Sequence, residues 1–496
     1  MSARDDGSLQ GRAEVLGLFL GSCGNTLPAL TISFMTSSSD PLRVAVVGGG
    51  IAGLAVSAAL RQQGHVVEIF EASDTNNEPG FGIAIPPNGI KALEALQGQR
   101  GNILPVEWKQ VQFESSHRTS DLVYYIDTEQ YQAVFVYRGD KPPVSFNMEY
   151  YPSAFGQYLA GCSRISLHSE LKHLAFSDQH EHPPCIIHLS CFTLSCDPDQ
   201  GTITLKDGQK LQFDLVIGAD GIKSRIRRSI NPTLPGPSAT GICAFRFTIG
   251  KTKLLECLPE LEWIKKDELA GPRVLLGGRS RNIFMYAINC PERGEVFSVT
   301  VRCKDKRDQT ISKWRVDVPR ETMLTLFHDF DTKWQKLLNL APPVISLWQL
   351  RALEPIQPWS RGKTCILGDA AHAMFQNLDQ GAAQSLEDAL LLRTLLPPGT
   401  PKSAIPEILK RFENIRQPRV HSIQKLSIKQ LLLPVTVKNP NYLRSPELQT
   451  PIMGYDVVNE LSPCQFSSIP EEIEGRKTVA PASSCDGWAE QNPVLH

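Results

Sequence analysis

The sequence predicts an α/β fold in which a Rossmann-like nucleotide-binding domain is interleaved with a mostly β domain and followed by C-terminal helices. Three observations predict this arrangement. A glycine-rich turn at 48–53 joins an apolar run to a helical pattern, segments at 213–228 and 364–396 again lead an apolar run into a glycine turn, and residues 240–302 alternate in the manner of strands.

Residues 42–71 have the pattern of one βαβ unit. The apolar run at 42–47 is short enough for a buried parallel strand. A helix with apolar spacing follows at 51–63 and ends before Gly64, which can act as its C-terminal cap. A second strand at 65–71 completes a unit of about 30 residues.

The first turn of this unit has the pattern G-x-G-x-x-G. Gly48 permits the tight turn, Gly50 lets the backbone approach a pyrophosphate, and Gly53 lets the helix pack closely on the strand. The amides and dipole of the helix would then face the phosphates. Glu71 ends the second strand, 23 residues after Gly48, where its carboxylate can accept hydrogen bonds from ribose hydroxyls. The unit predicts a bound dinucleotide rather than a ligand-free turn. It does not distinguish FAD from NAD, and Glu71 disfavours NADP because its 2′-phosphate would be repelled.

The later elements follow from apolar spacing and turn residues. Helices are predicted at about 89–96, 380–396 and 404–432. Strands should dominate up to residue 144, and Asp207-Gly208 predicts a hairpin before a buried strand at 215–217.

We expect the nucleotide-binding domain to comprise about 42–120, 150–230 and 350–400, and the sheet domain about 121–149 and 231–349. A helical segment should follow at 401–461. Residues 1–41 are predicted to be a disordered or optional extension, because Met35 and a Thr/Ser run before the first strand have the pattern of a natural start. Residues 462–496 lack apolar periodicity and are predicted to be a disordered tail.

Composition excludes several functions. The 51 basic and 52 acidic residues give a net charge of -1, and no basic stripe or zinc spacing indicates a nucleic-acid partner. The 12 cysteines form no C-x-x-C pair, which favours reduced thiols in a cytoplasmic protein and no metal site. No apolar run reaches about 18 residues, so no transmembrane segment is expected.

Two further segments end strands in polar turns. The first, at 213–228, is FDLVIGADGIKSRIRR, in which Asp220 lies in a tight turn before four basic residues. The second, at 364–372, is TCILGDAAH. Asp369 would lie just past the strand and could bind a ribityl or ribose hydroxyl. The amino end of the next helix, near Gly381 and Ala382, would face an electron-rich ring or a phosphate.

In this order and spacing the three segments resemble the dinucleotide, Asp-Gly and Gly-Asp fingerprints of the single-component FAD-dependent aromatic monooxygenases of the para-hydroxybenzoate and salicylate hydroxylase type. The resemblance covers about residues 42–460 and extends to 80–96, 241–247 and 353–372. It implies a substrate-binding role for the sheet domain. It also implies FAD contacts by the following residues: Gly48, Gly50, Gly53, Glu71, Ala84 through its backbone, Asp220, Asp369 and Ala382.

The resemblance further implies that Arg246 and Tyr286 orient the substrate oxygen, where the cation would favour a phenolate. A structural role is expected for His372. The activity implied is a monooxygenase in which NADPH or NADH reduces FAD, and a flavin C4a-hydroperoxide formed from O2 hydroxylates or epoxidises a small electron-rich molecule. The substrate would be aromatic, or resemble a polyketide, alkaloid or terpenoid of secondary metabolism. A flavin-dependent oxidase and a weakly flavinylated, non-catalytic relative stay open as alternatives.

The chain departs from the family pattern at two places. Residues 150–155 lack the arginine that the family commonly places before a helix to contact the flavin. Gln376 stands where the family commonly has Pro, and Asp379-Gln380-Gly381 replaces a glycine-rich helix start. A carboxylate at Asp379 would disfavour an anionic reduced ring. These departures bear on FAD affinity and reduction rate, and they leave the dinucleotide fold intact.

Overall fold

A computed structural model of the chain describes residues 40–459, except for the segments 78–79, 99–128, 131–132, 139–143, 179–180, 260–272, 278–280, 292, 312 and 433–445. The predicted tail lies outside the described residues, as does the predicted N-terminal extension except for its last two residues. Among the residues that are described, no helix is both long and apolar enough to cross a membrane.

The first layer is a six-stranded sheet in the order β19-β20-β12-β1-β2-β8. Its strands are β1 (Arg43–Val47), β2 (Val66–Phe70), β8 (Ile186–His188), β12 (Leu215–Gly218), β19 (Ser360–Arg361) and β20 (Thr364–Ile366). All neighbours pair in parallel except β19 with β20. The side chains of β12 and β20 are buried throughout, as expected of parallel strands covered on both faces. The strands predicted at 42–47, 65–71 and 215–217 are therefore confirmed.

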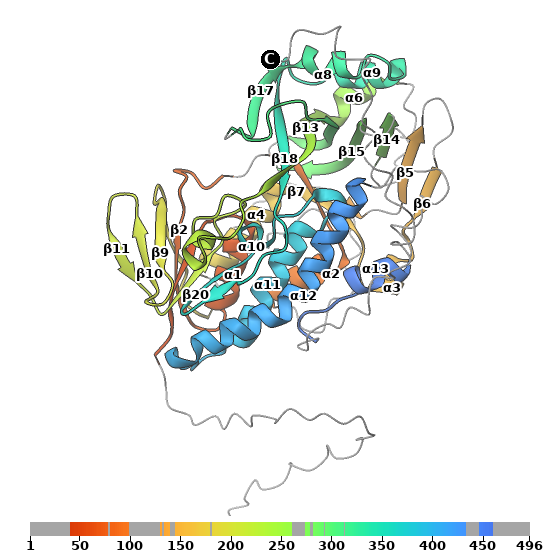
Figure 1. The fold of residues 1–496 in the computed structure, drawn as a ribbon. Helices are drawn as coiled ribbons and strands as arrows, with labels where there is room; N and C mark the ends of the chain where they lie inside the picture. The colour runs from red at the N-terminus through yellow and green to blue at the C-terminus, as the bar shows by residue number, and fades with distance from the viewer. Residues whose placement is uncertain are drawn as a thin grey trace, which may run out of the picture. The chain divides into compact units, whose positions relative to one another are not determined.

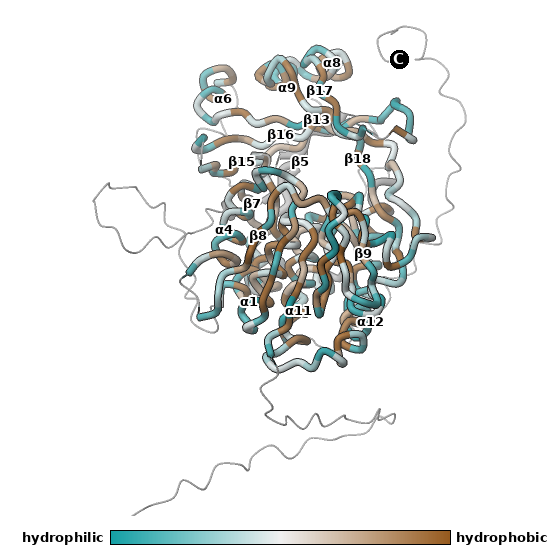
Figure 2. The backbone as a smooth tube through the Cα atoms, turned by 90° about the vertical axis from the view of Figure 1, so that its left-hand side faces the viewer, coloured by the Kyte–Doolittle hydropathy of each residue, from teal (hydrophilic) through white to brown (hydrophobic). Residues whose placement is uncertain are grey.

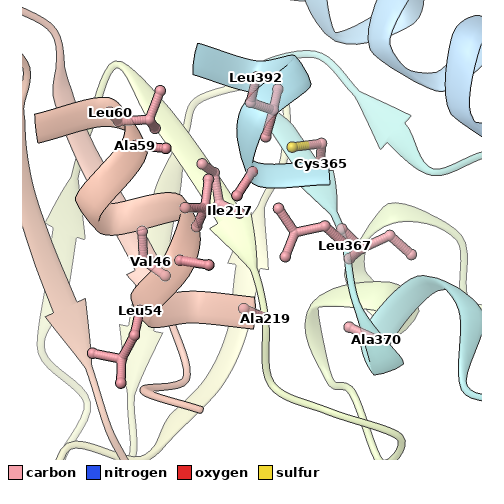
Figure 3. Packing of buried hydrophobic residues seen from close by; sticks show 14 of the residues in the cluster. Val46, Leu54, Ala59, Leu60, Ile217, Ala219, Cys365, Leu367, Ala370 and Leu392 are labelled. Carbon is pink, nitrogen blue, oxygen red and sulfur yellow. The ribbon is translucent and has the colours of Figure 1, made fainter. Parts of the chain in front are cut away.

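Helices and a small sheet complete this part of the molecule. The helices are α1 (Ile51–Arg61), α2 (Pro87–Leu96), α4 (Arg164–Phe176), α5 (Ile226–Ile230), α10 (Asp369–His372) and α11 (Gln380–Leu395). Leu54 and Leu60 of α1 share one apolar core with Val46, Ile217 and Leu392 (Figure 3). An antiparallel sheet of β9 (Thr193–Asp197), β10 (Thr202–Leu205) and β11 (Lys210–Gln212) adds residues to the same core, and it contains the hairpin predicted from Asp207-Gly208.

A second, eight-stranded sheet has the order β17-β18-β13-β16-β15-β14-β5-β6. Its strands are β5 (Ala133–Arg138), β6 (Val144–Asn147), β13 (Ser238–Gly250), β14 (Arg273–Gly277), β15 (Arg281–Cys290), β16 (Gly294–Lys304), β17 (Arg315–Pro319) and β18 (Val344–Ala352). One face is apolar and packs against α6 (Lys251–Cys257), α8 (Arg320–Leu326) and α9 (Thr332–Asn339), which Figure 1 shows at the top. The predicted strands at 240–302 are confirmed, and the domain boundaries stay a prediction.

The remaining elements lie beside these two sheets. They are the small sheet β3 (Gly82–Ile85), β4 (Glu129–Gln130) and β7 (Ala160–Ser163), the helices α3 (Tyr151–Phe155), α12 (Ile405–Leu432) and α13 (Pro446–Met453), and the short 3-10 helices η1 (Gln376–Leu378) and η2 (Lys402–Ala404). Hydrophobic residues concentrate in the interior around α1 and α11, and hydrophilic residues at turns and outer helix faces (Figure 2). The fold is thus mixed α/β, with a Rossmann-like region, a sheet-rich region and C-terminal helices.

Candidate active site

The three fingerprint turns lie at one edge of the six-stranded sheet. Since β1, β12 and β20 are parallel neighbours, their carboxyl ends meet. Gly48 has φ +102°, and a Cβ there would lie 2.5 Å from the carbonyl oxygen of Ala219. Gly368 has φ +56°, and a Cβ there would lie 2.6 Å from the Cβ of Ala52. The first turn therefore touches both the second and the third.

The glycine loop before α1 contains one glycine that is tightly packed and another that faces open space. A Cβ on Gly53 would lie 1.9 Å from the carbonyl oxygen of Gly48, so only glycine fits there. A Cβ on Gly50 would meet nothing within 4 Å. The first turn of α1 contains no acidic residue, and no side chain caps its amino end within the described chain. This open, uncapped end suits an anionic ligand such as a pyrophosphate.

Glu71 holds the glycine loop in place. Its Oε2 accepts a hydrogen bond from the Gly49 amide at 2.6 Å, and its Oε1 accepts one from the Ser73 amide at 2.8 Å. Each carboxylate oxygen retains acceptor capacity for a ribose hydroxyl, and that role stays a prediction. His168 of α4, which the sequence did not single out, lies 3.0 Å from the Gly49 carbonyl oxygen through Nε2.

Asp220 caps the start of α5 and leaves one oxygen available. Its Oδ2 accepts hydrogen bonds from the amides of Arg225 and Ile226 at 2.7 and 3.2 Å. Its Oδ1 is buried and has no hydrogen-bond donor among the described residues. Burial raises the pKa of Asp220 although these hydrogen bonds oppose the shift. An unsatisfied oxygen beside Gly48 is suited to a hydroxyl of a bound ligand.

The third turn leads to a second open helix end. Asp369 begins α10 and its side chain is exposed. Asp379 precedes α11 in the left-handed conformation, at φ 55°, and its side chain makes no capping hydrogen bond. A Cβ on Gly381 would meet nothing within 4 Å, and Ala382 is partly exposed. The amino end of this 16-residue helix is thus accessible to a ring or a phosphate.

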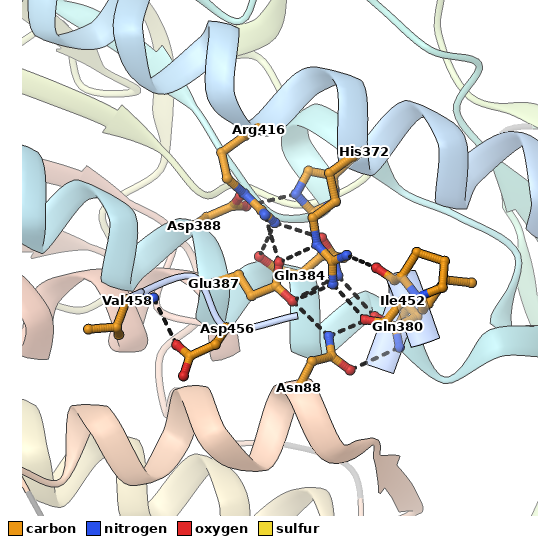
Figure 4. A network of polar contacts seen from close by, with 12 residues as sticks. Asn88, His372, Gln380, Gln384, Glu387, Asp388, Arg416, Ile452, Asp456 and Val458 are labelled. Atoms are coloured by element: carbon orange, nitrogen blue, oxygen red, sulfur yellow. Dashed lines mark hydrogen bonds and ion pairs between the residues drawn. The ribbon is translucent and has the colours of Figure 1, made fainter. Parts of the chain in front are cut away.

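A buried ionic network fixes the third turn (Figure 4). Oδ2 of Asp388 accepts hydrogen bonds from the Gly368 amide at 3.0 Å and lies 2.7 Å from His372 Nε2, while its Oδ1 lies 2.8 Å from Arg416 Nε. Glu387 bridges Arg416 and Arg419 at 2.6 and 2.8 Å. Burial alone would raise the pKa of Asp388, but the charges of His372 and Arg416 outweigh burial and lower it to about 2. The structural role expected for His372 agrees with this arrangement.

The polar face of the eight-stranded sheet meets the segment between β20 and α11. Strand register places Arg246 opposite Thr300 and Tyr286 opposite Ser298, which puts both predicted residues on one face. Nη2 of Arg246 donates a hydrogen bond to Oε1 of Gln376 in η1. The structure therefore brings Arg246 to the segment that follows the third fingerprint, with Tyr286 on the same face of the sheet.

Tyr286 stands against the strand that follows the flavin-proximal loop of the family pattern. A Cβ on Gly82 would lie 2.7 Å from the Tyr286 hydroxyl, and Tyr286 shares a buried cluster with Ala84. Burial raises the pKa of Tyr286, and the negative charge of Asp379 raises it further. The Tyr286 hydroxyl therefore stays protonated at neutral pH.

Two further arginines lie near this face. Nη1 of Arg302, on β16, donates to Oδ1 of Asn377 at 3.1 Å. Arg164, at the start of α4, is close enough to Arg246 to lower its pKa, although burial is the larger cause. The segment 150–155, where the family arginine is missing, packs as an aromatic cluster in and before α3. Sequence reasoning missed Arg302, although alternation along β16 placed it on the polar face.

A basic cavity lies beside the second fingerprint. Its volume is about 270 Å³, and it is lined by Lys223, Arg225, Arg227, Arg228, Pro237 and Trp314. The ring of Trp314 has Lys223 Nζ at 4.2 Å and the Arg351 guanidinium at 4.6 Å. In the part of the chain that the structure describes, no cluster of three or more His, Cys, Asp or Glu side chains could hold a metal ion.

Comparisons with known proteins identify the family to which the chain is similar. A family model described as an FAD binding domain matches residues 197–427, and one described as an NAD(P)-binding Rossmann-like domain matches residues 46–80. Hispidin-3-hydroxylase from Neonothopanus nambi is 34% identical over 436 residues, which cover 85% of this chain and 96% of the relative. A salicylate hydroxylase from Pseudomonas putida is 27% identical over 87% of this chain and 92% of its own length.

The fold of the chain is also similar to that of solved flavin-dependent hydroxylases. A solved salicylate hydroxylase substrate complex superposes with a TM-score of 0.65 at 21% identity, over 85% of this chain and 97% of the other. The fold, the converging turns and the sequence match agree with one another. The chain therefore belongs to the FAD-dependent monooxygenases of the salicylate hydroxylase type, and its cofactor is FAD.

Proposed function

We propose that this monooxygenase uses NADPH or NADH and O2 to hydroxylate a small, electron-rich aromatic substrate. The observation that carries the proposal is the position of Arg246 and Tyr286 on the polar sheet face, where Arg246 is hydrogen bonded to Gln376 in the segment that leads into α11. The likeness to enzymes named hispidin-3-hydroxylase and salicylate hydroxylase supports an aromatic substrate. A place in secondary metabolism is part of this proposal.

The described residues fit FAD at both ends of the cofactor. The open space at Gly50 and the uncapped start of α1 would take the pyrophosphate, with Glu71 on the ribose. Asp369 would bind the ribityl chain, and the open start of α11 at Ala382 would face the ring. Asp220 would bind near the pyrophosphate, and the backbone of Ala84 would lie near the flavin. When bound, FAD supplies the electron transfer and the activation of dioxygen.

Arg246 and Tyr286 would orient the ring that is oxygenated. The Nε of Arg246 is buried and has no acceptor among the described residues, and an oxygen of the substrate would supply one. A fixed cation favours the ionised form of a phenol, which makes the ring a better nucleophile. The protonated Tyr286 hydroxyl supplies a neutral contact, and the apolar cluster with Ala84 and Ile288 helps to exclude water.

The basic cavity supports a dinucleotide as the electron donor. Its four cationic side chains and Trp314 suit a phosphate joined to an aromatic base. Arg227 connects its wall to the third fingerprint, since its Nη1 donates to the Ala370 carbonyl at 2.7 Å. The reductant would thereby bind next to the predicted ribityl position at Asp369.

The proposal is tested by coupling, which is the amount of oxygenated product formed per molecule of NADPH or NADH consumed. We expect the wild-type enzyme to oxidise NADPH or NADH faster in the presence of one of a panel of phenols and indoles, and to place one oxygen atom from ¹⁸O2 in the product. Arg246→Ala should lower the product formed per reductant consumed by tenfold or more while FAD content stays unchanged. Arg315→Ala is the matched control, because Arg315 lies on the same sheet with its side chain 55% exposed.

Two results would contradict the proposal. Reductant oxidation without ¹⁸O in any product would favour the flavin-dependent oxidase. Unchanged coupling in Arg246→Ala, with the loss appearing only in FAD content, would remove Arg246 from the substrate site.

A further inference from the structure

Two cysteines face each other across inner strands of the eight-stranded sheet. Cys243 of β13 pairs directly with Cys303 of β16 in the antiparallel register, and the two Sγ atoms lie 3.3 Å apart. Directly opposed residues of an antiparallel pair have Cα atoms about 4.5 or 5.5 Å apart, and both spacings fall within the roughly 4.4–6.8 Å that a disulfide spans. The backbone therefore needs little movement for the two sulfur atoms to join.

The cysteine pair lies on the face of the sheet opposite to Arg246 and Arg302. Both thiols are buried in the apolar cluster that packs against α6, α8 and α9. The two arginines are an odd number of residues away along the same strands, so their side chains point to the other face. A bond between the sulfur atoms would thus join the strands that carry the arginines without entering the proposed substrate site.

The cysteine pair is close to one end of the pairing between β13 and β16. Beyond it the ladder has one more residue pair, Ile242 with Lys304, and Lys304 is exposed. On the other side of β13, the register with β18 shifts between Ala239 and Cys243. Strand ends and irregular pairings open at a lower free energy than the middle of a continuous ladder. A molecule as small as hydrogen peroxide can therefore reach these thiols.

The contact between the two sulfur atoms gives them different reactivities. A hydrogen bond donated by Cys243 to the sulfur of Cys303 raises the pKa of Cys243 and lowers the pKa of Cys303, although burial opposes the lowering. The thiolate is the form that attacks an oxidant. Cys303 is thus suited to react first, with Cys243 in position to resolve the product.

We propose that Cys243 and Cys303 form a modification site at which hydrogen peroxide closes a disulfide between β13 and β16. The Cys303 thiolate attacks one oxygen of the peroxide, the O–O bond breaks, and the products are a sulfenic acid and, after protonation of the leaving hydroxide, water. The Cys243 thiol then attacks the sulfur of the sulfenic acid and releases a second water molecule. The two thiols lose two electrons and two protons, and one peroxide is reduced to two molecules of water.

The proposed activity supplies the oxidant, and to this extent the inference rests on the proposed function. When NADPH or NADH and O2 are consumed without oxygenated product, the O2 is reduced to hydrogen peroxide. The disulfide would close the chain between residues 243 and 303, which restricts the unfolded chain and stabilises the folded one. Uncoupled turnover would thereby make the enzyme more resistant to unfolding.

Treatment of the FAD-loaded enzyme with hydrogen peroxide tests the site without turnover. The enzyme is reduced, desalted, exposed to a few equivalents of peroxide, unfolded in N-ethylmaleimide and digested without reductant for mass mapping. We expect a linked peptide that joins Cys243 to Cys303 and disappears with dithiothreitol, and a melting temperature raised by about 3 °C or more. Cys303→Ser should lose both effects. Cys257→Ser, which removes an exposed cysteine, should keep both.

Each outcome decides the proposal. A linked peptide and a reversible rise in melting temperature that are absent only from Cys303→Ser support it. Absence of the linked peptide overturns it, as does a link from either cysteine to another thiol, and an unchanged melting temperature in fully linked protein overturns the stabilising role. If Cys303→Ser does not fold, Cys243→Ala gives the same comparison.

A second experiment separates the site from the source of the oxidant. NADPH or NADH replaces the added peroxide, in air and without substrate, and catalase is present in a parallel sample. We expect the same linked peptide without catalase and its loss with catalase. A link that forms with added peroxide but not during this turnover supports the site and counts against the proposed use of the reductant.

Discussion

Replacing Asp388 by Asn removes one negative charge from the buried network that holds the Gly-Asp turn. The carboxylate is in contact with the Gly368 amide, His372 and Arg416 at 3.0, 2.7 and 2.8 Å. Asn can still accept some of these hydrogen bonds, but among the described residues Arg416 then keeps one ionic partner, Glu387, which it shares with Arg419. Removing one member of a buried ion pair typically costs about 3–5 kcal/mol.

The pKa of Asp388 gives a second, smaller estimate of the free energy of unfolding that this carboxylate contributes. A decrease from 3.8 to about 2 corresponds to roughly 2 kcal/mol of folded-state stabilisation by the ionised carboxylate. Because the folded pKa lies below the unfolded one, this contribution is complete above about pH 4 and is lost as the pH falls towards 2. We therefore expect Asp388→Asn to cost about 2–4 kcal/mol at pH 7, a large share of a typical stability of about 5–15 kcal/mol.

Urea unfolding at pH 7 measures this loss, and a titration with FAD measures its effect on the site. The affinity for FAD should fall as well, because the Gly368 amide loses its charged acceptor. Glu295→Gln is the control, since the Lys251–Glu295 pair is at the surface with Glu295 50% exposed and should change stability by less than about 1 kcal/mol. Equal stability losses in the two variants would refute the reasoning.

Four other substitutions separately test packing, cofactor space, proton uptake and coupling. Gly53→Ala should destabilise the apoprotein, because its Cβ would lie 1.9 Å from the Gly48 carbonyl oxygen, whereas Gly50→Ala should leave apoprotein melting unchanged and weaken FAD binding at least tenfold in a fluorescence titration. Burial lowers the pKa of His421 from 6.5 to about 4, so the unfolded chain takes up the proton first and stability should fall as pH decreases between these values. His421→Phe should flatten that part of the stability profile, and an unchanged profile would exclude His421 as its source. Tyr286→Phe should lower coupling without moving the pH profile near neutrality, because the raised pKa keeps the Tyr286 hydroxyl protonated, and a shifted profile would contradict this.

Much of the nucleotide-binding fold follows from local sequence patterns. The glycine spacing at 48–53 and the apolar runs before it and before Gly218 and Gly368 determine adjacent strands whose ends converge, and the structure has these strands. Such features are predictable because the residues that specify a strand, a turn and a helix start are close together in the chain.

The ionic network could not be predicted in the same way. Two acidic residues in the middle of α11, Glu387 and Asp388, pair with two arginines of the next long helix, α12. These arginines are Arg416 and Arg419. Arg302 likewise could not be recognised as a neighbour of Arg246 from the sequence, because the two meet only when β16 pairs with β13. Sequence spacing gives the face of each element, but these pairings depend on how distant elements pack.

The absorption spectrum of the purified, folded protein tests the central claim most directly. We predict that the protein shows the visible absorption bands of oxidised flavin, either on purification or after FAD is added. The bands of the bound FAD should differ from those of free FAD. A folded sample that stays colourless after reconstitution with FAD would contradict the assignment of these three converging turns to the cofactor.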